Sequence, residues 1–595
     1  EIPNINHFST QGSSGGPVGL VNISFIKDVT LSTSSFGAEY DNALSGVLAF
    51  KQRDANKEKL SGNFRLGSSE AGLTIEGPIN DKSSFIFSLR RSYLQFIFKA
   101  FGFSFLPDYW DYQFKLSHEI DNNNSIKLIG IGSIDRLTVN EPDKFDFENQ
   151  SVIEQIPLTK QNTETFGLTW RRKYKSVNGF FDLSISNNNL NNNFIRYKNN
   201  LTKSDPTYSN ISRENETKLR FISNHNINDL KFSFGFNLMS AKYTNKTKFD
   251  YFNINYSTDL NLIKYGFFVK SSKLFFNQDL GLSLGFRFDQ DNFTSNNNIF
   301  RNFSPRLSLS YSLSEDNNWK LNLTTGLYYK IPTYTALGFK DINDNFSNTN
   351  LLYTKSNHYV IGIEYNTSYS SRFTIESFLK KYNNYPISVL DNVSLANKGA
   401  DFEVLGNELL LSVGKGKSYG IEFLYQQKLQ NNFYGIFSYT FFFSEFSNLD
   451  NIYLPSVWDN RHLISFTGGY KLKKNWEISS KLRFTGNTPY APVDIVSSST
   501  SYPEIIFDYS KLGDYSIQSF TKLDLRIDKR WNFKSTSMNF YIDIENVLAN
   551  EIPIPPEYGL SRDENQNIIM PMSLIEVESD NRTSVIPSIG FVFYF

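Results

Sequence analysis

The sequence contains no cysteine and carries no net charge, and each absence excludes classes of protein. Without cysteine, the chain has no disulfide scaffold, no thiolate zinc site and no cysteine nucleophile. The 60 Lys and Arg residues balance 60 Asp and Glu residues, so the chain lacks the basic excess with which proteins bind polyanions. We therefore expect no nucleic-acid partner.

Long apolar segments are lacking as well. No uninterrupted apolar run approaches the roughly 18 residues of a membrane-spanning helix, which excludes a bundle of such helices. A membrane β-barrel remains open, because barrel strands alternate apolar and polar residues. Aromatic residues, by contrast, are abundant: 55 Phe, 34 Tyr and 6 Trp make up 16% of the chain. This composition favours strands over helices.

Apolar and polar residues alternate strictly in many segments, most clearly toward the C-terminus. Apolar residues share one face in 319–327, 475–484, 522–531 and 539–545. We expect the charged residues on the opposite faces to be lumen-facing: Lys481, Arg483, Asp524, Arg526, Asp528, Asp543 and Glu545. Pairing with one another and hydrogen bonding to a plug are their expected roles. Strands of a soluble β-sandwich alternate in the same way, so alternation alone does not separate the two folds.

The number and spacing of the strand-like segments distinguish these folds. From residue 61 onward we count 22 segments, with centres near residues 64, 75, 87, 115, 129, 169, 182, 221, 236, 267, 284, 309, 324, 362, 376, 422, 437, 466, 480, 526, 541 and 590. Short turns follow the even-numbered segments, and long connections, such as 188–216 and 243–261, follow almost all odd-numbered ones. Membrane barrels have short periplasmic turns and long outer loops. The sequence therefore predicts an all-β, transmembrane antiparallel up-and-down β-barrel of about 22 strands.

The C-terminal segment adds a second indication. Ile589, Phe591, Phe593 and Phe595 share one face, and the sequence ends at an aromatic residue. A closing aromatic strand is similar to the signal by which outer-membrane barrels are recognised for insertion, and we assign this role to Phe591, Phe593 and Phe595. Aromatic residues near strand ends are expected to form interfacial girdles: Trp476, Trp531, Tyr541 and Tyr594.

Residues 1–53 differ from the rest of the chain, and a barrel this wide is normally closed by a plug. Ile26-Lys27-Asp28-Val29 leads into a tyrosine turn and a Ser-Gly-Val segment before the first expected barrel strand. This order resembles the distal half of the plug domain of a TonB-dependent outer-membrane receptor. The resemblance implies a partial plug in the lumen over 1–53 and a barrel over 54–595. It implies turn or hinge roles for six residues: Ile26, Lys27, Asp28, Gly37, Tyr40 and Gly46.

The plug segment departs from the family pattern in two ways. Asp41 follows the tyrosine where the family usually has glycine, which leaves the geometry of the turn open. A full plug is more than twice as long as residues 1–53, and the segment that engages TonB is not found in this sequence, so either the sequence begins within the plug or the chain is a shortened relative. Energy coupling is therefore expected only for a longer chain that carries such a segment.

Four further motifs resemble the receptors of Bacteroidota in particular: Arg90–Leu94, Trp458–His462, Thr485–Tyr490 and Tyr541–Val547. The resemblance implies a receptor in the outer membrane of a Gram-negative bacterium that imports a scarce nutrient, energised by TonB and the proton motive force. It implies contact with outer-membrane lipid and with TonB, and it leaves room for a surface lipoprotein or other outer-membrane subunits. We expect no enzymatic activity and no cofactor, and the sequence does not indicate the substrate.

Three segments with chemical connotations have ordinary explanations. Gly12–Gly16 matches the G-x-S-x-G nucleophile elbow, but Pro17 follows instead of a helix, so we expect no catalysis there. The loops 341–345 and 563–567 space oxygen ligands like the start of a calcium loop, without its glycine and its final carboxylate. We expect solvated turns and keep Asp341, Asn343 and Asn345 as weak metal candidates. The most apolar loop, Leu94–Leu106, is expected to pack on the barrel rim.

Three other classes of protein remain open. A non-transporting barrel that acts as a scaffold or partner subunit of an outer-membrane assembly is compatible with the short plug and the missing coupling segment, and the upstream sequence would separate it from an importer. An outer-membrane enzyme requires a Ser/His/Asn or carboxylate cluster that we cannot assemble from the sequence. A soluble all-β protein would stay in solution without detergent.

Overall fold

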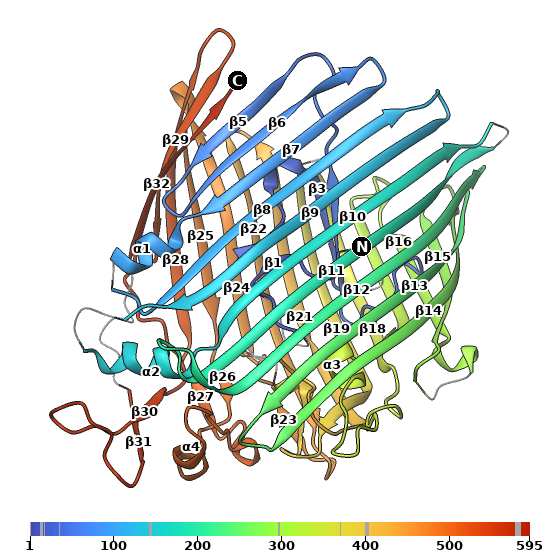
Figure 1. Cartoon of the computed structure of the whole chain (residues 1–595). Helices are drawn as coiled ribbons and strands as arrows, with labels where there is room; N and C mark the ends of the chain where they lie inside the picture. The colour runs from blue at the N-terminus through green and yellow to red at the C-terminus, as the bar shows by residue number, and fades with distance from the viewer. Residues whose placement is uncertain are drawn as a thin grey trace.

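A closed antiparallel β-barrel forms most of the molecule, and the N-terminal residues lie inside it (Figure 1). The computed structural model describes residues 2–11, 16, 18–34, 36–100, 102–141, 145–175, 177–294, 298–368, 370–398, 404–577 and 585–595. The wall consists of 22 strands. In chain order these are β5 (Ser61–Leu66), β6 (Glu70–Asn80), β7 (Ser83–Ser92), β8 (Phe105–Glu119), β9 (Asn124–Val139), β10 (Leu158–Lys173), β11 (Asn178–Asn199), β12 (Ser204–Ile227), β13 (Leu230–Phe249), β14 (Ile254–Phe275), β15 (Leu280–Asp291), β16 (Ser304–Ser312), β17 (Trp319–Lys330), β18 (Thr354–Ser368), β19 (Ser371–Ser388), β21 (Leu410–Gln430), β22 (Phe433–Ser447), β24 (His462–Leu472), β25 (Trp476–Thr485), β28 (Phe520–Asn532), β29 (Ser537–Glu545) and β32 (Ile586–Tyr594).

The strand count read from the sequence is confirmed, because each of the predicted centres lies within its own strand. Every strand pairs with its neighbours in the sequence, and the last strand, β32, closes the barrel by pairing with β5. Two short strands, β20 (Val393–Ser394) and β23 (Tyr453–Pro455), extend the ladders of β19 and β22 at the rim. The up-and-down topology therefore holds along the whole wall.

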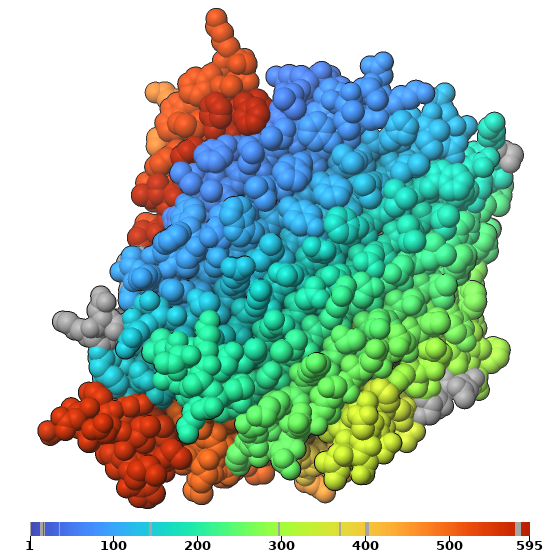
Figure 2. Space-filling view, viewed as in Figure 1, coloured from blue at the N-terminus to red at the C-terminus, as the bar shows by residue number. Residues whose placement is uncertain are grey.

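The alternation of residues sets which side of the wall faces outward. Ile478, Ile527, Ile542 and Ile589 lie opposite one another across β25, β28, β29 and β32. Each is 41–55% exposed on the barrel exterior, as expected for side chains that face lipid. Figure 2 shows that side chains cover β5–β14 as an unbroken surface. The wall thus presents apolar residues outward and its polar residues to the lumen.

Short turns lie at one end of the barrel and the larger loops at the other (Figure 1). One part of the sequence-based loop assignment is wrong: most of 188–216 and 243–261 is strand. β11, β12, β13 and β14 are 22, 24, 20 and 22 residues long, about twice the length needed to cross a membrane. Their outer halves lie beyond the apolar band and need no apolar exterior, so the Asn-rich sequence there looked like loop.

The loops at the larger end carry the remaining elements. The helices are α1 (Leu94–Ala100), α2 (Phe147–Gln155), α3 (Tyr334–Leu337) and α4 (Ile495–Ser501). The 3-10 turns are η2 (Ile299–Asn302), η3 (Leu395–Asn397) and η5 (Tyr509–Lys511) in the loops and η4 (Lys473–Asn475) in a short turn. Two small hairpins pair β26 (Thr488–Tyr490) with β27 (Tyr515–Ile517), and β30 (Tyr558–Leu560) with β31 (Leu574–Glu576). Among the helices in the described ranges, none is long and apolar enough to cross a membrane.

Among the described residues, the largest apolar cluster lies where a loop folds into the outer mouth of the barrel. The loop between β17 and β18 contributes Ile331, Leu337 and Leu351, which pack against Tyr243 of β13 and Leu260 of β14. Thr333 caps the N-terminus of α3 by accepting a hydrogen bond from the Ala336 amide. This loop therefore narrows the lumen from the outer side.

The N-terminal residues form a chain of short elements inside the barrel. In order these are β1 (Asn6–His7), β2 (Val18–Gly19), η1 (Ile23–Phe25), β3 (Ile26–Ser32) and β4 (Val47–Gln52). β1 pairs with β2, and β3 pairs with β4. We call the described residues between 2 and 60 the luminal segment. Its contacts with the inward faces of the wall build the candidate site.

Candidate functional site

The turn between β3 and β4 is closed by its own backbone and contacts the barrel wall. The Tyr40 amide donates a hydrogen bond to the Gly37 carbonyl oxygen at 3.1 Å, which closes the tyrosine turn. Asn42 adopts a left-handed backbone with φ of 53°, a conformation that asparagine tolerates better than most residues. Asn42, rather than Asp41, therefore takes the strained position of the turn.

Asp41 forms a buried ion pair with the barrel wall. Its Oδ2 lies 2.5 Å from Nζ of Lys264 on β14 and 3.7 Å from the Arg287 guanidinium on β15. Asn237 on β13 donates a further hydrogen bond to the same carboxylate at 3.0 Å. Burial opposes the charge on Asp41, but Lys264 and Arg287 outweigh it and hold the pKa of the carboxyl well below its usual range.

Six basic side chains of the wall surround residues 33–45 of the luminal segment. We call them the basic wall: Arg220, Lys264, Lys270, Arg287, Arg306 and Lys380, which come from β12, β14, β15, β16 and β19. Most of their hydrogen bonds reach backbone carbonyl oxygens, namely those of Thr33, Phe36, Gly37, Ala38, Glu39, Tyr40 and Ser45. Lys270 also pairs with the Glu39 carboxylate at 2.8 Å. The basic wall therefore binds this turn largely through its backbone.

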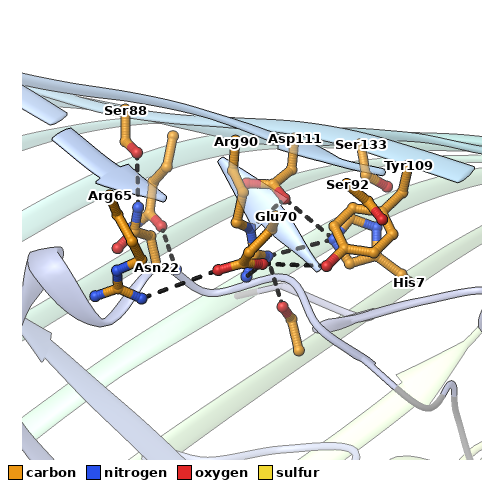
Figure 3. A network of polar contacts seen from close by, with 12 residues as sticks. His7, Asn22, Arg65, Glu70, Ser88, Arg90, Ser92, Tyr109, Asp111 and Ser133 are labelled. Carbon is orange, nitrogen blue, oxygen red and sulfur yellow. Dashed lines mark hydrogen bonds and ion pairs between the residues drawn. The ribbon is translucent and has the colours of Figure 1, made fainter. Parts of the chain in front are cut away.

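A second anchor lies on β7–β9 and centres on His7 (Figure 3). The His7 ring is fully buried; its Nδ1 lies 2.6 Å from Asp135 and its Nε2 lies 3.2 Å from Asp111. Tyr109 stacks on the ring with centroids 4.1 Å apart. Arg90 contacts Asp111 at 2.6 Å and donates to the Gly19 carbonyl oxygen of the luminal segment at 2.7 Å.

Burial and the two neighbouring carboxylates have opposite effects on the pKa of His7. Burial opposes a charge on the ring, but the hydrogen bonds to Asp111 and Asp135 outweigh it and raise the pKa of His7 above its ordinary value. The network continues through Arg90 to Glu70, which accepts a hydrogen bond from Tyr109 at 3.1 Å (Figure 3). The carboxylates of the wall thus favour the protonated form of His7.

The end of the luminal segment, where it joins the wall, forms a third anchor. Arg53 binds Glu76 on β6 through two hydrogen bonds of 2.6 and 2.7 Å. Lys115 on β8 contacts Asp54 at 2.9 Å. Phe25 is completely buried against Ile86 of β7. This anchor combines paired charges with a small apolar contact.

The residues assigned to the plug turn and hinge fall into two groups. Ile26, Lys27 and Asp28 begin β3, and the side chains of Lys27 and Asp28 are exposed. Gly37 and Tyr40 lie in the turn and offer carbonyl oxygens to Arg306 of the basic wall. Gly46 opens β4, where a Cβ would lie 2.8 Å from the Ser32 carbonyl oxygen. The structure brings only the second group, Gly37, Tyr40 and Gly46, close to the hairpin turn and the wall.

The residues assigned to the lumen share one face of β25, β28 and β29. Cross-strand register aligns Lys481 with Asp524, Arg483 with Lys522, and Arg526 with Asp543. Tracing the ladder through β32, β5 and β6 places this face on the same side as Arg90. Ion pairs join Arg526 to Asp528 at 2.8 Å and Lys522 to Glu545 at 2.6 Å. Arg526, Asp528 and Glu545 therefore have charged partners on this face, whereas the anchors described above come from other strands.

Cross-strand register shows which face of the wall the closing-strand residues and two of the girdle candidates occupy. Phe591 and Phe593 pair with Phe540 and Met538 on the outward face, and backbone hydrogen bonds join Phe595 to Gly62 in both directions. The girdle assignment is wrong for Tyr541 and Tyr594, which pair with Gly590, Asp528, Asn63 and Ser537 on the luminal face. Arg526 lies 3.9 Å above the Tyr541 ring. Tyrosine is found on both faces of a barrel wall, because its hydroxyl suits a polar lumen as well as a membrane interface. The residue type alone therefore did not show which face these two tyrosines take.

The weak metal candidates form a turn. Asp341 accepts hydrogen bonds from the Asn343 and Asn345 amides at 2.9 and 3.0 Å. Asp563 accepts from the Asn565 and Asn567 amides in the same way. Both carboxylates therefore organise Asx turns, and within the described ranges no group of three or more acidic or His residues is arranged to hold a metal. Residues 12–15 of the Gly12–Gly16 motif lie outside the described residues.

Among the described residues, cavities lie beside the luminal segment and among the outer loops. One of about 1030 Å³ lies between the segment and strands β8–β12 and is lined by charges of both signs, among them Lys27, Lys127 and Glu216. A smaller one of about 150 Å³ lies among the outer loops beside Phe194 and Tyr208. The loop that lines the second cavity reaches the luminal segment, because the Leu405 amide donates to the Gln11 carbonyl oxygen at 3.1 Å.

Sequence reasoning missed the basic wall and the His7 anchor. The basic wall had a signal: Lys264, Arg287 and Arg306 occupy polar positions of alternating strands, as the residues expected to face the lumen on β25, β28 and β29 do. His7 had none, since its partners Asp111 and Asp135 lie 104 and 128 residues away. Only the closed barrel brings these groups together.

The chain was compared with protein families and with solved structures. The family described as "TonB dependent receptor-like, beta-barrel" matches residues 87–547. The FrpB iron transporter from Neisseria meningitidis superposes with a TM-score of 0.68 at 13% identity, covering 99% of this chain and 89% of that one. The pyoverdine outer-membrane receptor FpvA from Pseudomonas aeruginosa gives 0.67 at 12%, covering 98% and 85%. The copper transporter OprC gives 0.67 at 12%, covering 100% and 90%.

No curated protein matches the sequence. The structural likenesses, at these identities, show the fold. The family match extends over most of the barrel, and the family and fold imply an outer-membrane location in a Gram-negative bacterium. The chain belongs to the TonB-dependent receptor-like β-barrel family.

Proposed function

We propose that the protein is an outer-membrane receptor that takes up a scarce nutrient through a plugged barrel, energised by TonB and the proton motive force. In this proposal residues 1–53 act as the distal part of the plug and residues 54–595 form the barrel. The barrel carries out no covalent chemistry, and outer-membrane lipid, TonB and a surface lipoprotein or other subunits are its partners. A Bacteroidota source is part of the proposal and rests on the four motifs.

One observation carries the proposal: the luminal segment is held to the wall mainly by polar contacts. The basic wall binds seven backbone carbonyl oxygens and two carboxylates, and His7 and Arg53 bind carboxylates of the wall. Water can replace such contacts when a segment moves, whereas separating two apolar surfaces costs about 25 cal/mol per Å². A segment seated in this way suits a closure that must move and return.

The roles of individual residues follow from this arrangement. Gly37, Tyr40 and Gly46 shape the turn that the basic wall holds, and Ile26, Lys27 and Asp28 lead into it. The charges on β25–β29 keep the opposite side of the lumen hydrophilic. Phe591, Phe593 and Phe595 provide the insertion signal of the closing strand. Cargo approaches from the outer loops, where aromatic side chains and the 150 Å³ cavity lie.

The proposal names no particular nutrient, because the similar structures are described with different cargoes: iron, copper and pyoverdine. Growth of a deletion strain on defined iron, copper, vitamin, oligosaccharide and peptide sources identifies the nutrient. Uptake of that nutrient is then measured with and without a protonophore. Equal growth on every source, together with co-purification of the barrel with other outer-membrane subunits, would favour the non-transporting scaffold instead.

Movement of the luminal segment is tested with an engineered disulfide. The chain has no cysteine, so two cysteines form a defined pair. A Cβ placed on Gly285 of β15 lies 2.9 Å from the Cβ of Ala38, slightly closer than the roughly 3.5–4.5 Å of a disulfide. Ala38→Cys with Gly285→Cys therefore ties the turn to the wall after a small shift.

The proposal expects the oxidised double variant to lose uptake and the reduced one to regain it. Ala38→Cys and Gly285→Cys alone are the controls, and both should transport under oxidising conditions. Uptake by the oxidised double variant at the level of the single variants would show that this segment need not leave the wall.

A further inference from the structure

Four lysines gather on the exterior of the barrel near its outer rim. Cross-strand register places Lys381 of β19 directly opposite Lys417 of β21. In the next row toward the rim, Asn383 lies between Lys355 of β18 and Lys415 of β21. On β19, Lys380 and Tyr382 point into the lumen, where they contact the luminal segment. Lys381 and Asn383 alternate with them and therefore face outward, as do the lysines in the same register rows. We call Lys355, Lys381, Lys415 and Lys417 the exterior lysine cluster.

The exterior lysine cluster is poorly neutralised by the protein. Of the outward-facing residues described on β18, β19, β21 and β22, Glu445 is the only acid, and it pairs with Lys417 at 2.8 Å. Like charges directly opposite each other on a sheet are destabilising. Lys381 and Lys415 are exposed on this face. The cluster therefore offers three cationic groups beyond the one that Glu445 neutralises.

The cluster lies at the edge of the apolar band. One register row toward the membrane, Tyr359, Leu379, Tyr419 and Phe443 lie side by side across the same four strands. Rows of aromatic residues mark the membrane interface in outer-membrane barrels. The larger loops are at this end of the barrel (Figure 1), which makes it the outer leaflet. The lysines thus lie at the depth of the outer-leaflet headgroups.

An apolar groove opens below the cluster on the same exterior. It has a volume of about 500 Å³ and is lined by Phe423, Phe437, Tyr439, His462, Ile464 and Phe484. Tyr439 and His462 hydrogen-bond to each other at 3.0 Å, which leaves an almost wholly apolar lining. Phe423 lies three register rows below Lys417, roughly 20 Å along a strand and about 15 Å along the membrane normal after tilt. That distance is one leaflet of the hydrocarbon core.

We propose that this face is a binding site for a phosphate-bearing lipid of the outer leaflet. The exterior lysine cluster holds the phosphate groups, and the groove holds one of the acyl chains. The positive charge of this face favours an anionic lipid over a second copy of the chain. A symmetric contact between two copies through this face would place lysine against lysine. A zwitterionic or uncharged lipid would fill the groove but leave the lysines unneutralised.

The site is tested on the whole chain in detergent by native mass spectrometry with defined lipids. The probes are lipid A with two phosphates, its chemically dephosphorylated form, and phosphatidylglycerol. The test variant combines Lys355→Gln, Lys381→Gln and Lys415→Gln. The matched control removes three exterior lysines from other places, Lys246→Gln, Lys273→Gln and Lys529→Gln. Heat-modifiable migration on gels confirms that each barrel is folded.

The test variant should lose about tenfold or more in affinity for the phosphorylated lipid, and the control should retain it. Replacing the same three lysines with arginine should restore binding, since the charge returns. Ile464→Trp, which fills the groove, should weaken binding of both lipid A forms. Preference for phosphatidylglycerol over lipid A would identify the glycerophospholipid as the source of the phosphate.

Three results would overturn the proposal. The first is equal affinity of the wild type for phosphorylated and dephosphorylated lipid. The second is equal loss of binding in the test variant and the control. The third is a change of oligomeric state in the test variant with lipid affinity unchanged, which would assign the face to a second copy of the chain.

Discussion

Asp41 of the luminal segment and Lys264 of β14 form an ion pair of 2.5 Å in which the lysine is 2% and the aspartate 14% exposed. Asp41 stands where the family usually has glycine, so the departure from the pattern supplies the carboxylate that the wall binds. Because the pair is shielded from water, losing one partner leaves a charge without full compensation. The pair is therefore the most direct handle on how firmly the turn is seated.

Lys264→Met should loosen the turn at residues 36–46. Removing one partner of a buried pair costs about 3–5 kcal/mol, and Arg287 and Asn237 recover part of this for Asp41. Hydrogen exchange of the Ala38–Asn42 amides in the detergent-solubilised barrel measures the effect. The double variant Asp41→Asn with Lys264→Met should exchange more slowly than Lys264→Met alone, because no unpaired charge remains.

A matched pair on the exterior serves as the control. Lys242 and Asp259 lie 3.3 Å apart but are 56% and 59% exposed, and such pairs contribute about 0–1 kcal/mol. Lys242→Met should therefore leave the exchange of the turn unchanged. Equal acceleration by Lys242→Met and Lys264→Met would contradict the assignment of the buried pair as an anchor.

The sequence predicted the wall far better than the contents of the lumen. Strand number and facing follow from local alternation, and the isoleucine row at Ile478 and Ile527 needs nothing else. The His7 anchor depends on which inward residues of β8 and β9 meet a segment more than a hundred residues away. Long-range polar pairing of this kind leaves no periodicity in the sequence. For the same reason the sequence predicts a turn at Asp41 but not its ion pair with Lys264.

Alkaline conditions should release the N-terminal part of the luminal segment. The pKa of His7 is raised in the folded protein from an ordinary value of 6.5. Its charge therefore contributes stability that is fully present below about pH 6.5 and is lost as pH rises through the raised pKa. Limited proteolysis near residues 5–20 should accelerate over that range. His7→Gln should be cleaved faster at neutral pH and show no such rise; an unchanged profile in this variant would assign the pH effect to another group.

Gly46→Ala should destabilise the hairpin of β3 and β4. The new Cβ would lie 2.8 Å from the Ser32 carbonyl oxygen, and a backbone atom cannot move aside as a side chain can. We expect a cost of about 1–3 kcal/mol, seen as faster hydrogen exchange in Val47–Gln52. Gly19→Ala is the control, because nothing lies within 4 Å of its Cβ position. Similar exchange in both variants would show that the hairpin adapts.

Phe595 should contribute to the stability of the seam between β32 and β5. β32 and β5 share four register pairs, whereas β29 and β32 share nine. Phe595 adds two backbone hydrogen bonds to Gly62, of 3.0 and 3.1 Å. Deleting Phe595 should lower the temperature at which the folded band disappears on gels. Phe595→Ala keeps the backbone bonds, so it should keep this temperature and reduce only the amount inserted in cells. Unchanged insertion in that variant would contradict the signal assigned to the ring.

Ile527→Arg tests the orientation on which the barrel interpretation depends. Ile527 is 45% exposed and lies in the row with Ile478, Ile542 and Ile589, where an arginine in lipid costs about 2–4 kcal/mol near the midplane. Ser479→Arg lies on the opposite, luminal face beside Arg526 and meets water there, so it should cost much less. Equilibrium unfolding in lipid vesicles compares the two free energies. A larger loss for Ser479→Arg would mean that β25 and β28 present the other face to the membrane.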